Sequence, residues 1–152
     1  MDIRVGELRN KAVISLLEEH HNDMLSLSPP ESVHALDLTN LEKPDVTFWS
    51  LWINEELAGV GALKELDKNH GEIKSMRTST NFLRKGVARI LLEHILEQAS
   101  IRSYKKLSLE TGTMDAFLPA QKLYQQFGFH QCPPFGSYQL DPYSLFMSKN
   151  ML

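Results

Sequence analysis

A short basic turn that leads into an apolar-striped helix is the segment of this 152-residue sequence best suited to chemistry. The turn runs from Phe82 to Ala88, and an extended segment at 72–78 precedes it. The first backbone N–H groups of a helix lack intrahelical acceptors, and the helix dipole adds partial positive charge at the same point. This pattern predicts a site for an anion such as a phosphate group. The residues expected to form it are Arg84, Lys85, Gly86, Val87, Ala88 and Arg89.

Composition narrows the classes of function that fit. The formal net charge of −3 offers no whole-protein attraction for nucleic acid or anionic lipid, and the basic turn is too small to follow a nucleic-acid backbone. No segment approaches the roughly 20 apolar residues that span a bilayer, and the N-terminus lacks a signal-peptide pattern. Cys132 is the only cysteine, which excludes an intrachain disulfide and suits a reducing compartment. We therefore expect a cytoplasmic protein without nucleic-acid or membrane partners.

Hydrophobic periodicity predicts strands and helices in a mixed order. The expected helices cover residues 9–22, 84–100 and 118–127, and the expected strands cover about 3–8, 46–53, 57–66, 72–78, 105–111 and 144–148. Pro119 suits the first turn of the last helix and Gly128 the position after its end. This order is typical of an α/β or α+β fold with three layers around one central sheet, and the length predicts one domain over residues 1–152.

Two motifs carry a family resemblance. Residues 83–88 read Leu-Arg-Lys-Gly-Val-Ala, which is similar to the Gln/Arg-x-x-Gly-x-Gly/Ala signature, with Leu83 as the departure. Residues 120–129 read Ala-Gln-Lys-Leu-Tyr-Gln-Gln-Phe-Gly-Phe, which matches Ala-x-x-Leu-Tyr-x-x-x-Gly-Phe. With these motifs the chain resembles the GNAT acyl-CoA N-acetyltransferases from about residue 3 to 149, and in particular the bacterial YsnE-like acetyltransferases. The resemblance implies a GNAT fold, with a mixed central sheet of six to seven strands flanked by about four helices.

The resemblance also implies acetyl-CoA as the acetyl donor, without a metal. The pyrophosphate of acetyl-CoA would then occupy the predicted anion site. Ile73 and Met76 break the two-residue alternation of their strand, which predicts a β-bulge. If this strand also splays from its neighbour, the backbone of Met76, Arg77 and Thr78 could bind pantetheine, and an N–H group there would polarise the acetyl carbonyl. Two further cofactor contacts are expected at Phe117, where the family often has Asn, and at Ala120.

Acyl transfer to an amine needs a group that removes a proton from the amine and one that protonates the thiolate. By family analogy Tyr124 is the general acid. The base stays open between Glu72 on the expected 72–78 strand, Glu110 near the end of the expected 105–111 strand, and a chain of waters. Strand C-termini face the ligand crevice in such sheets, which favours Glu110, whereas the family usually carries its base on the strand of Glu72.

The acceptor is expected to be a primary amine of a small molecule. Ser28, Glu31 and His34 in an early Pro-rich segment and Tyr138 in the 133–141 loop are the candidate acceptor contacts, and a carboxylate on the substrate would suit Arg77 or His34. The six histidines show no metal-binding spacing, so no metal site is expected. A homodimer is left open. The alternative from another class is a non-catalytic, regulatory acyl-CoA-binding module with the same fold.

Overall fold

A seven-stranded sheet forms the centre of the computed structural model, which describes residues 1–30 and 38–151. The strands lie in the order β1-β2-β3-β4-β5-β7-β6, and all neighbours are antiparallel except the parallel pair β4 and β5. The predicted mixed sheet of six to seven strands is therefore confirmed. The strands are β1 (Asp2–Val5), β2 (Val46–Ile53), β3 (Glu56–Asp67), β4 (His70–Thr78), β5 (Lys106–Gly112), β6 (His130–Gln131) and β7 (Ser144–Asn150).

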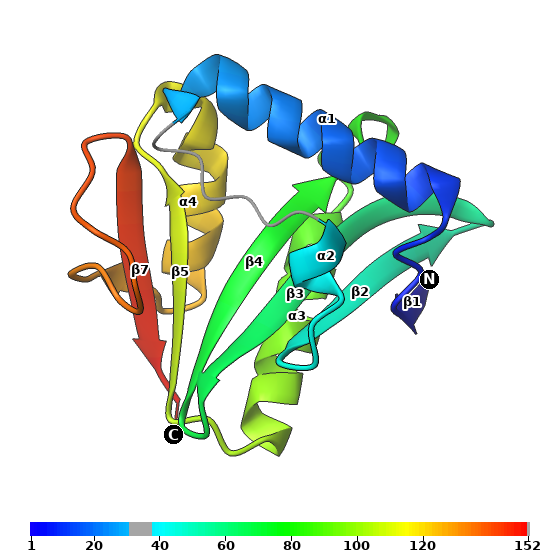
Figure 1. The fold of residues 1–152 in the computed structure, drawn as a ribbon. Coiled ribbons are helices and arrows are strands. Elements are labelled where there is room, and N and C mark those ends of the chain that lie inside the picture. Colours follow the sequence, from blue (N-terminus) through cyan, green and yellow to red (C-terminus); the bar gives the residue numbers. More distant parts are fainter. Residues whose placement is uncertain (31–37, 152) are drawn as a thin grey trace.

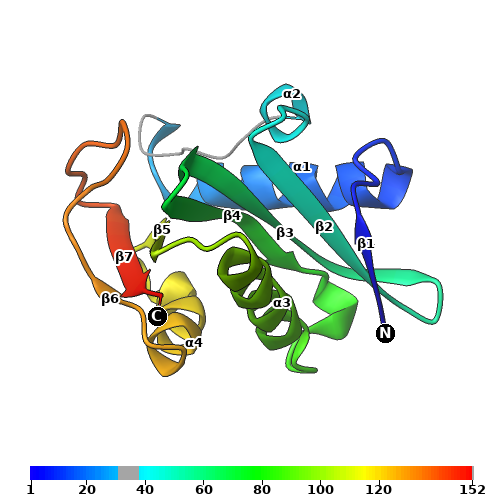
Figure 2. The same cartoon turned by 90° about the horizontal axis from the view of Figure 1, so that it is seen from below.

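Helices cover both faces of this sheet. On one face lie α1 (Lys11–Leu27) and the short α2 (Leu38–Leu41), and on the other lie α3 (Val87–Ile101) and α4 (Leu118–Gln126), as Figures 1 and 2 show from two directions. The predicted three-layer arrangement is thus present. The helices on each side pack apolar side chains against the sheet. Residues on the two faces of the sheet therefore have different neighbours.

The apolar stripes of the helices explain this layering. Leu91, Leu92 and Ile95 of α3 are fully buried against one face of the sheet, and Val13 and Leu16 of α1 are buried on the other. Burying a side chain of this size contributes about 1.5–3 kcal/mol each, before the entropic cost of ordering it. Packing of these stripes therefore fixes which face of the sheet each helix covers.

The observed boundaries differ from the predicted ones at functionally relevant points. The third helix begins at Val87 rather than at Arg84, because Arg84 and Gly86 adopt left-handed conformations with φ of +63° and +80°. The first helix continues to Leu27, and the two-residue strand β6 was not predicted. Gly128, with φ of +92°, follows the last helix as expected.

Candidate functional site

The parallel strands β4 and β5 diverge part of the way along their length. Their pairing runs from His70–Lys106 to Ile73–Leu109, yet β4 continues to Thr78 and β5 to Gly112. Figure 1 shows the two strands close together at one end and apart at the other. Beyond the last pair, the edge of β4 that faces β5 has no strand to bind, so its backbone N–H and C=O groups are available to another extended molecule. The splay on which the predicted pantetheine contact depends is therefore present.

The predicted bulge lies in this diverging part of β4. The register between β3 and β4 shifts so that Ser75 and Met76 together oppose Gly61, and Ser75 has φ of +57°. The bulge leaves the Met76 thioether on the α3 face, against Gly61, whereas the Arg77 side chain reaches α1 on the opposite face. A bulge of this kind redirects side chains beside a functional site.

The N-terminus of α3 follows directly after β4 and a single 3₁₀ turn (Thr80–Phe82). Gly86 is its N-cap residue and provides no side-chain hydrogen bond, so the amides of Val87, Ala88 and Arg89 have neither an intrahelical nor a capping acceptor. A Cβ atom at Gly86 would meet nothing within 4 Å. The turn thus presents free amides and a positive helix end to open space, as the predicted anion site requires.

The basic side chains near this turn point in different directions. Arg84 and Lys85 are exposed, and the Lys85 ammonium lies 5.4 Å from the centre of the Phe82 ring. Arg89 instead points toward α4, where its guanidinium donates a hydrogen bond of 2.6 Å to Gln126 and lies over the Phe127 ring. Arg84 and Lys85 are therefore better placed than Arg89 to add charge to a bound anion.

Tyr124 lies on α4, on the same face of the sheet as α3. It is buried and packs edge-on against Phe129, with ring centres 5.9 Å apart. Burial raises the pKa of Tyr124 to about 12, so the phenol keeps its proton at neutral pH. Within the described parts of the chain, no side chain or backbone group forms a hydrogen bond with its hydroxyl. The hydroxyl is therefore protonated and takes part in no hydrogen bond of the described structure.

Two more predicted cofactor residues lie near the start of α4. The Phe117 ring lies directly against Gly112 at the end of β5, where any side chain larger than hydrogen would collide with it. Ala120 is half-buried and packs against the main core cluster. Phe117 therefore forms part of the wall beside the diverging end of β5.

On the α1 face of the sheet, Glu72, Lys74 and Tyr138 form a closed polar network. Lys74 donates hydrogen bonds to the Glu72 carboxylate (3.0 Å) and to the Tyr138 hydroxyl (2.6 Å). The Tyr138 hydroxyl in turn donates to Glu72 at 2.6 Å. Burial and the adjacent Glu72 carboxylate raise the pKa of Tyr138. The network ties the 133–141 loop to β4, and sequence reasoning missed Lys74, although its spacing of two residues from Glu72 puts both on one face of the strand.

Removing Lys74 is expected to destabilise the fold. The Lys74 and Glu72 side chains are only 9% and 4% exposed, so Lys74→Ala would leave a buried carboxylate without its counter-charge. We expect the free energy of unfolding, measured by urea denaturation, to fall by about 3 kcal/mol or more. The matched control is Arg9→Ala, which breaks the exposed pair with Glu42 and should cost less than about 1 kcal/mol. Equal losses in both variants would contradict this account.

Glu110, the second candidate base, is the first β5 residue beyond the last β4–β5 pair. It lies opposite Phe146 of β7, is partly buried, and accepts a hydrogen bond of 2.7 Å from the Ser144 hydroxyl. Glu72, by contrast, lies opposite Ser108 in the paired part of the strands. The structure thus brings Glu110 to the point where the strands part and keeps Glu72 within the ion-paired network.

Arg77 connects β4 to α1. Its Nη2 atom donates hydrogen bonds to Glu19, at 2.7 Å, and to Asp23. Glu19 and Asp23 are four residues apart on α1 and thus share one helix face. His20 lies in the same region. Burial and the charge of Arg77 lower the pKa of His20 to about 4. The sequence predicted a backbone role for Arg77 and suited its side chain to a substrate carboxylate, but the two ion pairs with α1 were not foreseen.

The remaining predicted acceptor contacts have different outcomes. Ser28 is buried, and its N–H group donates to the Met24 carbonyl and closes the last turn of α1. Tyr138 belongs to the network with Glu72 and Lys74. Glu31 and His34 lie outside the described residues.

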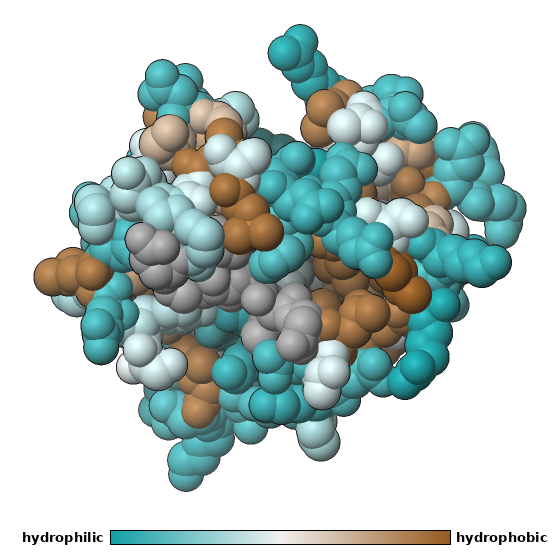
Figure 3. All heavy atoms as spheres, turned by 45° about the horizontal axis from the view of Figure 1, so that its top comes forward, coloured by the Kyte–Doolittle hydropathy of each residue, from teal (hydrophilic) through white to brown (hydrophobic). Residues whose placement is uncertain are grey.

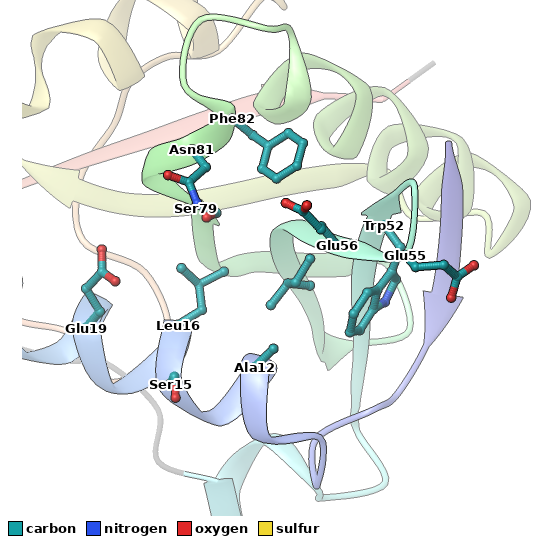
Figure 4. A pocket seen from close by; sticks show the side chains of 11 residues that line it. Ala12, Ser15, Leu16, Glu19, Trp52, Glu55, Glu56, Ser79, Asn81 and Phe82 are labelled. Atoms are coloured by element: carbon teal, nitrogen blue, oxygen red, sulfur yellow. The ribbon is translucent and has the colours of Figure 1, made fainter.

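A separate hollow of about 430 Å³ lies on the other side of β4 from β5. It is bounded by α1, by the β2–β3 hairpin and by the segment 79–82, as Figure 4 shows. Glu19 and Trp52 lie toward opposite ends of it in that view. The surface at this end of the molecule mixes hydrophobic and hydrophilic areas (Figure 3). Glu19, which lines the hollow, also accepts a hydrogen bond from Arg77.

No set of three or more His, Cys, Asp or Glu side chains is arranged to hold a metal ion among residues 1–30 and 38–151. Over the same residues, no helix has the length and apolar character needed to cross a membrane.

Comparisons with known proteins agree on one family. The model of the acetyltransferase (GNAT) family matches residues 13–129. The uncharacterized N-acetyltransferase YsnE of Bacillus subtilis is 56% identical over 151 residues, which is 99% of this chain and 100% of that protein. The uncharacterized N-acetyltransferase YedL of Escherichia coli is 53% identical over 146 residues, covering 96% and 92% of the two chains.

Solved structures share the fold at lower identity. An acyl-CoA N-acyltransferase from Klebsiella pneumoniae superposes with a TM-score of 0.77 at 24% identity, covering 99% of this chain and 97% of that one. A GNAT family acetyltransferase from Elizabethkingia anophelis, solved with acetyl-CoA bound, gives a TM-score of 0.71 at 19% identity and covers 99% and 97%. At these identities the similarity shows a shared fold.

Proposed function

The chain belongs to the GNAT acetyltransferase family, as an N-acetyltransferase, and from this premise we propose that it moves an acetyl group from acetyl-CoA to the primary amine of a small molecule by direct attack. One observation carries the proposal. The strands β4 and β5 part after Ile73 and Leu109, and β4 leads through one short turn to the uncapped N-terminus of α3. An extended molecule with an anionic end fits this combination of free strand edge and positive helix end.

Acetyl-CoA has these two parts. Its pyrophosphate would accept hydrogen bonds from the free amides at the start of α3, where Gly86 leaves open space and Arg84 and Lys85 add positive charge. Its pantetheine arm would pair with the unpaired edge of β4 near Met76 and Thr78, as an added strand does. The acetyl carbonyl would then lie close to backbone N–H groups after the bulge, which stabilise an oxyanion.

The substrate ammonium first loses a proton to a base, and the lone pair of the neutral amine forms a bond to the acetyl carbon, giving a tetrahedral intermediate with an oxyanion and a positively charged nitrogen. The nitrogen then loses its extra proton to the base or to water, the carbonyl re-forms, the carbon–sulfur bond breaks, and the sulfur leaves with the bonding electrons. Tyr124 gives its proton to the sulfur and regains one from solvent, and CoA and the N-acetyl product result. The raised pKa of Tyr124 and the lack of a described partner for its hydroxyl support this role.

We assign the base to Glu110 rather than Glu72. Glu110 lies where the strands part, on the α1 face, and can take the proton directly or through a water. Glu72 is buried, pairs with Lys74 and accepts a hydrogen bond from Tyr138, so protonating it would weaken both contacts. A carboxylate that holds a buried cation in place is a poor proton acceptor.

The assay that tests the function measures release of free CoA thiol with acetyl-CoA and a panel of small primary amines, and identifies the N-acetyl product by mass. Turnover with at least one amine is the expected result. Tight acetyl-CoA binding without turnover of any amine, together with no effect of replacing Tyr124, would favour the non-catalytic acyl-CoA-binding module instead.

Replacing the proposed base gives a sharper test. Glu110→Gln keeps the size of the side chain and a hydrogen bond to Ser144 but removes the proton acceptor, so we expect kcat/KM to fall about 100-fold. At higher pH, where more of the free amine is already deprotonated, the variant should recover part of the loss. Glu72→Gln is the comparison, and its main effect should be a lower melting temperature. A normal rate in Glu110→Gln would leave water as the base.

A further inference from the structure

Three buried side-chain nitrogen atoms lack hydrogen-bond partners in the described structure, and two of them belong to neighbouring side chains. These two are Nε of Arg77 on β4 and Nδ1 of His20 on α1, whereas the third, Nε2 of His94, lies on α3. The two side chains are near enough for the charge of Arg77 to act on the imidazole. Buried polar nitrogens in proteins are nearly always bonded to protein, water or ligand. Two such nitrogens close together, on the face of the sheet where Glu110 also lies, suit a partner that binds from outside the chain.

The chemistry of the two nitrogens limits that partner. A guanidinium Nε only donates hydrogen bonds, so the missing group must contain an acceptor such as an oxygen. Burial lowers the pKa of His20 to about 4, so the imidazole is neutral at pH 7 and can donate from Nδ1. Arginine presents adjacent N–H groups in a planar fork that matches the two oxygens of a carboxylate.

The present partners of Arg77 can give way to such a carboxylate. Glu19 and Asp23 both bind Nη2, and they are 45% and 49% exposed, whereas Arg77 is 20% exposed. Ion pairs with half-exposed carboxylates contribute little. A substrate carboxylate can therefore replace one of them, and the guanidinium keeps a counter-charge throughout. Together, Arg77, Glu19 and Asp23 carry one more negative than positive charge. This suits a ligand that brings an ammonium group as well as a carboxylate.

We infer that Arg77 and His20 bind a carboxylate of the acceptor, and that the acceptor is accordingly an amino acid or another amine that carries a carboxylate. This inference rests on the proposed N-acetyltransferase function. Arg77 follows the bulge on the strand whose backbone is proposed to hold the acetyl carbonyl, and its side chain points to the same face as Glu110. A carboxylate bound there holds the amine of the same molecule close to the acetyl carbon.

Matched pairs of acceptors test the inference. Each common amino acid is compared with its amide and with the amine left after removal of the carboxyl group, and kcat/KM is measured for all three. For at least one amino acid, the wild-type protein should prefer the carboxylate-bearing member by about 10- to 100-fold. Arg77→Lys keeps the charge but removes the fork, and His20→Leu removes the second donor. Each should reduce this preference at least about tenfold.

Controls separate this effect from damage to the fold. Arg102→Lys is the matched control, because it makes the same substitution at a guanidinium that donates a hydrogen bond to Thr47, outside the proposed acceptor site. This variant should keep the preference for the carboxylate-bearing acceptor. Thermal melts identify the variants that remain folded. If Arg77→Lys does not fold, His20→Leu provides the test. Equal rates for amino acids and their decarboxylated amines, or an unchanged preference in folded variants of both residues, would overturn the inference while N-acetyltransferase activity stands. No turnover with any amine would instead overturn the proposed function, and the inference with it.

Discussion

A Gly86→Glu variant is expected to lose measurable binding of acetyl-CoA while it remains folded. Gly86 caps α3 with φ of +80°, and a side chain there would meet no protein atom within 4 Å. The new side chain would therefore extend into the space proposed for the pyrophosphate. Its negative charge would repel the phosphates and occupy the free amides of the first helical turn. A like-charge contact of this kind costs about 3 kcal/mol, which corresponds to about 100-fold weaker binding.

Gly6 supplies a closely matched control for this experiment. Its φ is +82°, and a side chain there also meets nothing within 4 Å, but it lies between β1 and α1. Gly6→Glu and Gly86→Glu thus share the backbone strain, about 1–2 kcal/mol, and the added charge. Only Gly86→Glu should weaken binding of acetyl-CoA in calorimetry. Unchanged affinity in Gly86→Glu would exclude the pyrophosphate from this turn.

The sequence predicts those parts of the site whose geometry is local. The sequence predicts a helix start after the basic, glycine-containing turn because an apolar stripe follows it, although the exact first residue, Val87, was not foreseen. The bulge in β4 was foreseen because Ile73 and Met76 break a period of two. The same period places Glu72 and Lys74 on one face of the strand. These features depend on residues within a few positions of one another, so they can be read from the order of the residues.

Contacts across the fold could not be predicted in the same way. Tyr138 meets Glu72 and Lys74 only because the chain returns over β4 and β5 before it forms β7. Arg77 meets Glu19 and Asp23 only because α1 covers that face of the sheet rather than the other. Each contact joins residues more than 50 positions apart, and it depends on strand order and on which face each helix covers. Consequently, the sequence predicted the turn before α3 and the bulge in β4 better than it predicted the contacts between distant elements.

Tyr124→Phe is expected to slow acetyl transfer strongly without disturbing the fold or the binding of acetyl-CoA. No group in the described structure forms a hydrogen bond with the Tyr124 hydroxyl, so the substitution removes no hydrogen bond. The phenyl ring of Phe keeps the packing against Phe129. Removing a general acid lowers rates by about 100-fold or more, and kcat should fall by that factor. The pKa of about 12 means that wild-type Tyr124 remains protonated at working pH, so it should not limit the rate below about pH 11.

A change of leaving group distinguishes proton donation from a mere packing role. The thiolate of an acetyl thioester made from an aromatic thiol is a weaker base than that of CoA, so it leaves without needing a proton. Tyr124→Phe should therefore slow reaction with acetyl-CoA far more than reaction with such a thioester. Tyr104→Phe is the opposite control, because the Tyr104 hydroxyl donates to Glu65 at 2.8 Å, at a distance from the site. That variant should lose about 1 kcal/mol of stability and keep its rate. If Tyr124→Phe slows both donors equally, the tyrosine only shapes the site and another group protonates the sulfur.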